Sequence, residues 1–271
     1  MALNLAFETV GSGPPVLVLH GLFGSGANWR SVARHLAITH TVHSVDLRNH
    51  GSSPWADTMG YGEMADDVLQ LMDRLDLRAP TVIGHSMGGK VAMALALRQP
   101  QRIGGLVVVD IAPVSYADTL TPFAQAMSAA DVMATASLAE VQRRLQQAVP
   151  DPGVVPFLMQ NLVRHNDHFD WRINLVGICA AMPQLCGFPA ELLGARFERP
   201  VTVIAGERSD YVQARDGAAF APTMFPRAQL DVVAGAGHWV HADQPAAFVV
   251  SVKQALKRSA SVRRAPAAST T

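Results

Sequence analysis

The stretch Thr81-Val82-Ile83-Gly84-His85-Ser86-Met87-Gly88-Gly89-Lys90 decides the fold of this 271-residue chain. Apolar and β-branched residues open it and an Ala-rich run follows it, so it predicts a buried strand, a tight turn and a helix. Ser86 occupies the turn in a G-x-S-x-G pattern, where Gly84 and Gly88 keep Cβ atoms away from the bend. Such a turn presents the hydroxyl as a nucleophile. The alternative is a glycine-rich turn whose serine only caps the helix.

The segments on either side of this turn alternate between strand and helix patterns. Continuous apolar runs, such as Val16–Leu19, are typical of strands covered on both faces of a parallel sheet. The alternation predicts an α/β fold with a mostly parallel central sheet, flanked by helices and joined by right-handed crossovers. We expect strands at 3–10, 16–19, 41–46, 81–83, 106–110, 201–205 and 229–233, and helices at 29–38, 61–75, 91–97 and 245–256.

The strand pattern disappears between residues 114 and 199. Helical patterns occupy 123–133, 138–148, 154–163 and 173–182, and prolines 152, 156, 183 and 189 interrupt them. An all-helical insertion after the strand that follows the elbow helix predicts a cap over an apolar pocket, although helices that only cover a sheet face remain the alternative. The expected division is core 1–113, helical cap 114–199, core 200–258 and a disordered tail 259–271.

Composition limits the classes of partner. Lys plus Arg and Asp plus Glu both number 22, so the zero formal charge gives no attraction to nucleic acid or to an anionic membrane. Cys179 and Cys186 show neither disulfide-framework nor zinc spacing, which indicates buried thiols in a reducing compartment. Neither a signal peptide nor an apolar run of membrane-spanning length is visible. We expect a cytoplasmic protein, monomeric or homodimeric, that acts on a small molecule.

A nucleophilic serine needs a base, and the chain order predicts where it lies. In folds with this elbow, the histidine belongs to the glycine-bounded loop after the last strand. His238 in Gly235-Ala236-Gly237-His238 fits that position better than its neighbour His241. The glycine-rich loop after the 16–19 strand lacks both phosphate-binding patterns. We expect its Leu22 N–H and the Met87 N–H to form an oxyanion hole.

Other histidines are assigned supporting roles. His20, His50 and His85 lie in loops whose backbone is the useful part, so packing and hydrogen bonding to the backbone are their expected functions. His165 and His168 are three residues apart, but no carboxylate or cysteine set accompanies them. We therefore expect no metal and no cofactor.

Several motifs together resemble those of the α/β-hydrolase superfamily, and within it the YbfF-type bacterial esterases and their mitochondrial relatives. They span nearly the whole chain except the tail. The elbow is common to the superfamily, whereas the Arg-Asn-His-Gly and Asp-Ile-Ala-Pro segments are more selective. The motifs are His20-Gly21-Leu22-Phe23-Gly24-Ser25, Asp46-Leu47-Arg48-Asn49-His50-Gly51-Ser52-Ser53-Pro54, Gly84-His85-Ser86-Met87-Gly88-Gly89-Lys90, Val109-Asp110-Ile111-Ala112-Pro113 and Gly235-Ala236-Gly237-His238-Trp239-Val240-His241.

The acid that orients His238 is the least determined residue. Many members of the superfamily carry it in a G-x-x-D loop after the penultimate strand, but counting from Gly206 places Ser209 there and Asp210 one step later. The resemblance to the YbfF-type branch implies that Asp110 serves instead. We favour Asp110, keep Asp210 as the alternative, and expect Ser209 to supply an additional hydrogen bond.

The expected function follows from these residues and from the resemblance. A Ser86, His238 and Asp110 triad would transfer an acyl group to water, and the resemblance implies a carboxylesterase or an acyl-CoA thioesterase. The partner would be a small acyl ester or thioester. Other classes stay open: a carbon–carbon bond hydrolase, a cofactor-free haloperoxidase, or a non-catalytic ligand receptor.

Overall fold

The computed structural model describes residues 1–134, 137–149, 151–212 and 223–264. Seven strands in this part form one sheet in the order β1-β3-β2-β4-β5-β8-β9. Only β1 runs antiparallel to its neighbour, so the predicted mostly parallel sheet is confirmed. The strands are β1 (Phe7–Val10), β2 (Pro15–Leu19), β3 (Thr41–Val45), β4 (Thr81–His85), β5 (Gly105–Val109), β8 (Val201–Gly206) and β9 (Ala228–Val233).

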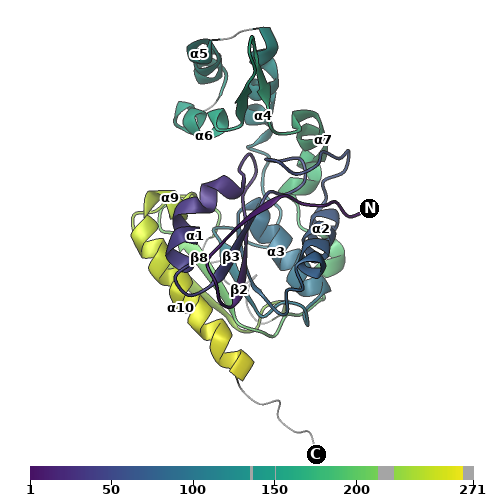
Figure 1. Cartoon of the computed structure of the whole chain (residues 1–271), viewed down its shortest axis with the longest axis vertical. Helices are drawn as coiled ribbons and strands as arrows, with labels where there is room; N and C mark the ends of the chain where they lie inside the picture. Colours follow the sequence, from purple (N-terminus) through teal and green to yellow (C-terminus); the bar gives the residue numbers. More distant parts are fainter. Residues whose placement is uncertain (135–136, 150, 213–222, 265–271) are drawn as a thin grey trace, which may run out of the picture.

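Helices cover both faces of this sheet (Figure 1). In β2, Val16 and Val18 point into one apolar cluster, while Leu17 and Leu19 point into the other. Because successive residues of a strand face opposite sides, this explains the continuous apolar run in the sequence. One layer contains η1 (Gly26–Trp29), α1 (Arg30–Leu36), α9 (Val240–Asp243) and α10 (Pro245–Arg264), and the other contains α2 (Tyr61–Arg74) and α3 (Met87–Arg98).

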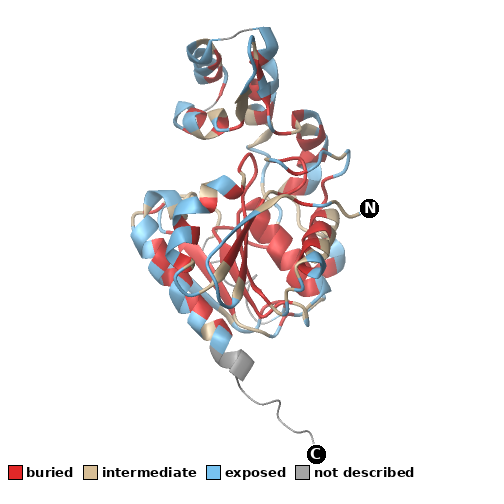
Figure 2. Ribbon diagram, in the orientation of Figure 1, coloured by how far each residue is buried: buried red, intermediate tan, exposed pale blue. Residues whose placement is uncertain are grey.

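The two helices α2 and α3 differ in how far they are buried. Helix α2 is amphipathic, with Met64, Val68 and Leu71 on its buried side. Helix α3 is buried along nearly its whole length, which its Gly- and Ala-rich sequence permits. A Cβ atom on Gly89 would lie 2.6 Å from Ile111 Cγ2, so this helix lies too close to its neighbours for a larger residue there. The buried sheet and α3 form the centre of the core (Figure 2).

The segment between β5 and β8 extends past one end of the sheet (Figure 1). The prediction that this insertion is all-helical is wrong, because β6 and β7 form an antiparallel hairpin in it. Each strand has three residues, which is too short to show a recognisable alternation. The elements are α4 (Thr121–Ala129), η2 (Val132–Ala134), α5 (Leu138–Ala148), η3 (Pro152–Val154), α6 (Val155–Met159), β6 (Leu162–Arg164), β7 (Phe169–Trp171), α7 (Leu175–Cys186) and η4 (Ala190–Leu192).

Two predicted helix ends in this insertion are also wrong. Helix α6 stops at Met159 instead of 163, where the hairpin begins. Helix α7 continues through Pro183 to Cys186, although that proline was expected to end it. Carbonyls near the end of α7 accept hydrogen bonds from outside the helix, from the Tyr61 hydroxyl at Leu185 and from Lys90 Nζ at Cys186. These contacts hold the last turn in place across the proline.

The closing helix is longer than predicted. Helix α10 runs to Arg264, so the prediction of a disordered tail is wrong for residues 259–264, and residues 265–271 lie outside the described part. Ser259 is buried, donates a hydrogen bond to the Ala255 carbonyl and packs against Gly105 at the start of β5. The polar composition of residues 259–264 did not indicate this contact. The predicted domain boundaries otherwise stay predictions.

Candidate active site

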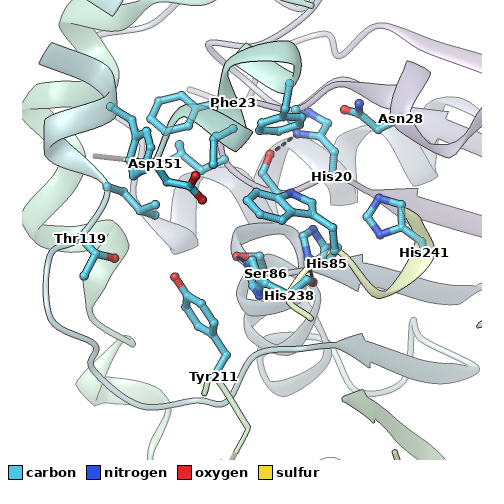
Figure 3. A pocket seen from close by; sticks show the side chains of 18 of the residues that line it. His20, Phe23, Asn28, His85, Ser86, Thr119, Asp151, Tyr211, His238 and His241 are labelled. Carbon is cyan, nitrogen blue, oxygen red and sulfur yellow. Dashed lines mark hydrogen bonds between the residues drawn. The ribbon is translucent and has the colours of Figure 1, made fainter. Parts of the chain in front are cut away.

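Ser86 lies in the turn between β4 and α3, at the carboxyl edge of the sheet. Its φ of 51° and ψ of −119° are a strained combination for a residue with a side chain. A Cβ atom on Gly84 would lie 2.1 Å from the Gly88 carbonyl oxygen, and one on Gly88 would lie 2.5 Å from the His20 carbonyl oxygen. Glycine is therefore required at both positions. The bend directs the Ser86 side chain into a cavity (Figure 3).

Three side chains from distant segments form one hydrogen-bonded chain. Ser86 Oγ lies 3.1 Å from His238 Nε2, and His238 Nδ1 lies 2.7 Å from Asp110 Oδ2. An ionised carboxylate can only accept a hydrogen bond, so it fixes the proton on Nδ1 and leaves Nε2 to accept from the serine. This tautomer is the one that a general base for Ser86 needs.

The last residue of β8 and the loop that follows it supply hydrogen-bond donors to the buried carboxylate of Asp110. The Gly206 N–H donates to Oδ1 at 2.9 Å, and the Ser209 hydroxyl donates a short hydrogen bond to Oδ2. Asp210, the alternative acid, has an exposed side chain, and the carboxylate that contacts His238 is that of Asp110. Ser209 thus makes the additional hydrogen bond that was predicted for it.

The expected oxyanion donors, Leu22 and Met87, both line a cavity that Ser86 also lines. Met87 is the first residue of α3, where a backbone N–H has no acceptor within the helix. Leu22 belongs to the loop that follows β2, and both residues line the same small cavity as Ser86. Asn161 Nδ2, from the insertion, donates to the Phe23 carbonyl at 2.8 Å and so connects this loop to the cap.

His20 and His50 hold the backbone of this loop and its neighbour. The Leu47 N–H donates to His20 Nε2 at 3.0 Å, and the Phe23 N–H donates to His50 Nε2 at 3.2 Å. Their other ring nitrogens contact backbone carbonyls. Burial lowers the pKa of His20 to about 4 and that of His50 to about 3, so both rings are neutral and can accept these bonds. Both make the backbone contacts predicted for them.

Two further histidines lie near His238. His85 Nε2 lies 2.9 Å from the His238 carbonyl oxygen and so holds the backbone of that loop. The His241 ring stacks on Trp29, with ring centroids 4.8 Å apart, instead of contacting Ser86. Burial lowers the pKa of His241 to about 4 and that of His85 well below its usual value. Neutral neighbours add no positive charge beside the His238 ring.

Tyr211 was not predicted from the sequence. Its ring stacks on His238 with centroids 4.0 Å apart and an angle of 23° between the planes. The Tyr116 hydroxyl donates to the Tyr211 carbonyl at 2.7 Å and holds this segment. The imidazole is thereby fixed by its ring face as well as by Asp110. In the sequence, the only feature that could have pointed to Tyr211 is its position directly after Ser209 and Asp210.

A cavity of about 230 Å³ opens in front of Ser86 and His238 (Figure 3). The core contributes the Leu22 loop and the His238 loop, while the insertion contributes Phe123, Val154 and Phe157. The insertion therefore forms one wall of the cavity, as a cap would. Most of the lining surface is apolar, so this cavity suits a substrate with a large apolar part.

Lys90 is buried behind the elbow and was not predicted as a structural residue. Its Nζ donates to the carbonyls of Val114, Cys186 and Gly187 at 2.9, 3.1 and 2.6 Å. Burial lowers the pKa of Lys90 to about 8. Because Val114 begins the insertion and Gly187 directly follows α7, this one ammonium group joins the elbow helix to two distant segments of the insertion. In the sequence, the only feature that could have pointed to this role is the position of Lys90 directly after the glycines of the elbow.

A second buried charge fixes the loop after β3. Arg48 makes a bidentate ion pair with Asp67 of α2, at 2.6 and 2.8 Å, and both side chains are fully enclosed. The Leu3 N–H also donates to Asp67. His50 lies in the same loop and accepts a hydrogen bond from the Phe23 N–H, so this ion pair helps to position the histidine that holds the oxyanion loop. No pattern in the sequence indicated that these two charged side chains are buried.

Within the described residues, no three His, Cys, Asp or Glu side chains converge closely enough to hold a metal ion. His165 and His168 stack on each other, and His168 contacts Asp167. Cys179 and Cys186 are free, half-buried thiols, and burial raises the pKa of each. In the same part of the chain, every helix is too short or too polar to cross a bilayer.

Known proteins resemble the chain over most of its length. Residues 14–153 match the family model described as alpha/beta hydrolase fold. Esterase YbfF of Escherichia coli strain K12 is 36% identical, over 94% of this chain and 99% of its own. The sn-1-specific diacylglycerol lipase ABHD11 of Danio rerio is 35% identical, over 91% and 79%. The solved structure of a marine microorganism esterase has a TM-score of 0.89 at 33% identity, over 94% and 100%. The chain belongs to the α/β-hydrolase fold family.

Proposed function

We propose that this protein is a serine hydrolase that cleaves carboxylic esters, or acyl thioesters, through an acyl-serine intermediate. The hydrogen-bonded chain from Ser86 through His238 to Asp110, opening on an apolar cavity, is the observation that carries the proposal. The names of the esterase and lipase relatives support the same reaction class.

In the first step, Ser86 Oγ attacks the substrate carbonyl carbon while His238 Nε2 takes the hydroxyl proton. The carbonyl oxygen becomes an oxyanion, to which the N–H groups of Leu22 and Met87 donate. His238 then gives the proton to the leaving oxygen or sulfur, and the acyl group stays on Ser86. One ester bond breaks and one forms, so no oxidant or further reactant is needed.

In the second step, water hydrolyses the acyl-serine. His238 Nε2 removes a proton from the water as it attacks, and the same N–H groups hold the second oxyanion. Collapse releases a carboxylic acid and returns the proton to Ser86. Throughout, Asp110 keeps the Nδ1 proton in place and stabilises the imidazolium, while the Tyr211 ring holds the imidazole plane.

Other reactions of the same three residues remain alternatives. A carbon–carbon bond hydrolase or a cofactor-free haloperoxidase would use the same geometry, and a ligand receptor would use only the cavity. The intact proton path between Ser86 and His238 favours catalysis over simple binding. No observation favours a carbon–carbon bond or a halide over an ester.

The test combines covalent labelling with a substrate panel. We expect a fluorophosphonate probe to label the wild-type protein and to leave Ser86→Ala unlabelled, because the probe traps an activated serine. The matched control is Ser128→Ala, an exposed serine of α4 remote in function from the elbow, which should be labelled like the wild type. The panel contains p-nitrophenyl esters and acyl-CoA thioesters.

Hydrolysis of panel members that disappears in Ser86→Ala would support the proposal. Labelling without turnover of any ester or thioester would contradict it and favour one of the other serine reactions. Absence of both labelling and turnover in a folded wild-type protein would favour the receptor.

A further inference from the structure

Two cavities meet at Ser86. The larger has a volume of about 230 Å³ and is called here the wide cavity, and the smaller has about 40 Å³ and is called the narrow cavity. Both are lined by Leu22, Ser86, Thr119, Leu120 and Tyr211, so they share a mouth at the nucleophile. An ester bound at Ser86 therefore has two directions available for its two substituents.

The position of the base distinguishes the two directions. His238 and Trp239 line the wide cavity, whereas Met87 lines the narrow one. The base must return its proton to the leaving oxygen, so the alcohol of the ester has to lie on the His238 side. The acyl chain then points the other way, into the narrow cavity beside the Met87 N–H.

The two volumes differ enough to set a size limit. The narrow cavity, of about 40 Å³, has room for only a short substituent. The carbonyl group itself stays at Ser86 and does not use this space. The wide cavity, several times larger, accepts a bulky alcohol.

The walls define the chemistry of each substituent. The ammonium of Lys90, the charged group among the described residues of the narrow cavity, is already bonded to three carbonyls, so this cavity is in effect apolar. The side chains that line only this cavity include Tyr61, Ile111, Tyr116, Met182, Leu185 and Cys186. The apolar walls of the wide cavity are Phe23, Leu120, Phe123, Val154, Phe157 and Trp239.

Charge in the wide cavity bears on the leaving group. Asp151 lines it, and its described lining residues include neither lysine nor arginine. A phosphate-bearing leaving group such as coenzyme A would meet a carboxylate without a compensating cation, which disfavours it. A neutral alcohol meets no such repulsion.

From these observations we propose that the substrates are esters of short acyl groups with bulky, apolar, neutral alcohols. The narrow cavity binds the short acyl chain, and the wide cavity binds the bulky alcohol. This inference rests on the proposed function, because it takes Ser86 and His238 as nucleophile and base.

The first experiment varies one substituent at a time. With p-nitrophenol as the constant alcohol, we expect kcat/KM to be highest from acetate to butyrate and at least about tenfold lower at octanoate, because extra methylenes do not fit. With acetate as the constant acyl group, 2-(1-naphthyl)ethyl acetate should exceed ethyl acetate, because the two alcohols are similarly basic and differ in size, and it should also exceed acetyl-CoA. An acyl profile that rises to octanoate or beyond would overturn the acyl assignment, and equal rates with acetyl-CoA would overturn the leaving-group assignment.

The second experiment tests which wall limits which substituent. Met182→Ala enlarges the narrow cavity and should raise the octanoate-to-acetate ratio of kcat/KM by about tenfold. The milder Met182→Val should raise it less and gives the same information if the alanine variant does not fold. Phe157→Ala, in the wall of the wide cavity, is the matched control: it should lower the preference for the naphthylethyl ester over the ethyl ester and leave the acyl ratio unchanged.

A reversed result, with Phe157→Ala changing the acyl limit and the Met182 variants changing the alcohol preference, would overturn the assignment. Fluorophosphonate labelling separates the two levels of failure. An enzyme that is labelled but prefers long acyl chains contradicts only this inference. A folded protein that is neither labelled nor active contradicts the proposed function itself.

Discussion

Replacing Asp110 with asparagine reverses one hydrogen bond in the proposed triad while keeping its shape. Asp110 Oδ1 accepts from the Gly206 N–H, whereas Oδ2 faces both His238 Nδ1 and the Ser209 hydroxyl. An asparagine must keep its oxygen towards Gly206, because a backbone N–H cannot accept. Its NH₂ group then faces His238 Nδ1, which has to give up its proton and become the acceptor.

The consequence is a histidine with its proton on the wrong nitrogen. His238 Nε2, which carries that proton in the Asp110→Asn variant, can no longer accept one from Ser86. A change of this type costs about 10⁴-fold in kcat. This corresponds to about 5 kcal/mol of activation free energy, while the fold should be hardly affected because the isosteric amide fills the same space.

The assay is hydrolysis of p-nitrophenyl acetate by Asp110→Asn and by Asp210→Asn, with thermal unfolding measured for both. Asp210 is exposed, so its asparagine variant should keep wild-type activity and serves as the control. Near-normal activity in Asp110→Asn, together with a large loss in Asp210→Asn, would refute the assignment of the acid. If Asp110→Asn strongly lowers the thermal stability, its activity should be divided by the concentration of active sites that the fluorophosphonate probe labels.

Two further predictions concern stability. The folded-state pKa values of His20 and His50, about 4 and about 3, lie below the unfolded value near 6.5, so the unfolded chain binds more protons in acid. Measured by urea titration, the free energy of unfolding should reach its full value above pH 6.5 and fall by about 2 kcal/mol per histidine by pH 5. A free energy of unfolding that does not change over this range would contradict the burial of these histidines as neutral rings. Arg48→Met should cost about 3–5 kcal/mol by the same method, because it leaves Asp67 buried and unpaired, and adding Asp67→Leu should recover much of it. A double variant less stable than Arg48→Met would refute this reasoning.

The sheet could be predicted from the sequence because its signal is local. The run Val16–Leu19 is apolar on both faces of the strand, and the elbow glycines 84 and 88 have no sterically acceptable substitute. Burial and backbone geometry act on each of these positions separately. Composition along the chain therefore contains enough information to locate the strands and the turn.

The insertion could not be predicted as well because its stability comes from distant contacts. Strands Leu162–Arg164 and Phe169–Trp171 are fixed by pairing with each other. Helix α7 passes Pro183 with its last carbonyls bonded to Tyr61 and Lys90. These partners are far away in sequence, and the usual rule that proline ends a helix assumes that they are absent. The size of the two cavities depends on the same contacts.

The contact between Ser209 and Asp110 explains why the loop after β8 has a serine where related loops have the acid. Strands β5 and β8 are neighbours, so the residues after both strands reach the same edge of the sheet, and strand order alone cannot choose between them. Counting from Gly206 puts Ser209 where the common G-x-x-D loop has its acid, and Ser209 bonds to the carboxylate of Asp110. An aspartate at 209 would face Asp110 with like charge, and one of the two would have to be neutral. Ser209 Oγ contacts the same Asp110 oxygen that faces His238 Nδ1, so ionised acids at 110 and 209 would exclude each other. A serine at 209 avoids this repulsion and donates a hydrogen bond to the Asp110 carboxylate instead.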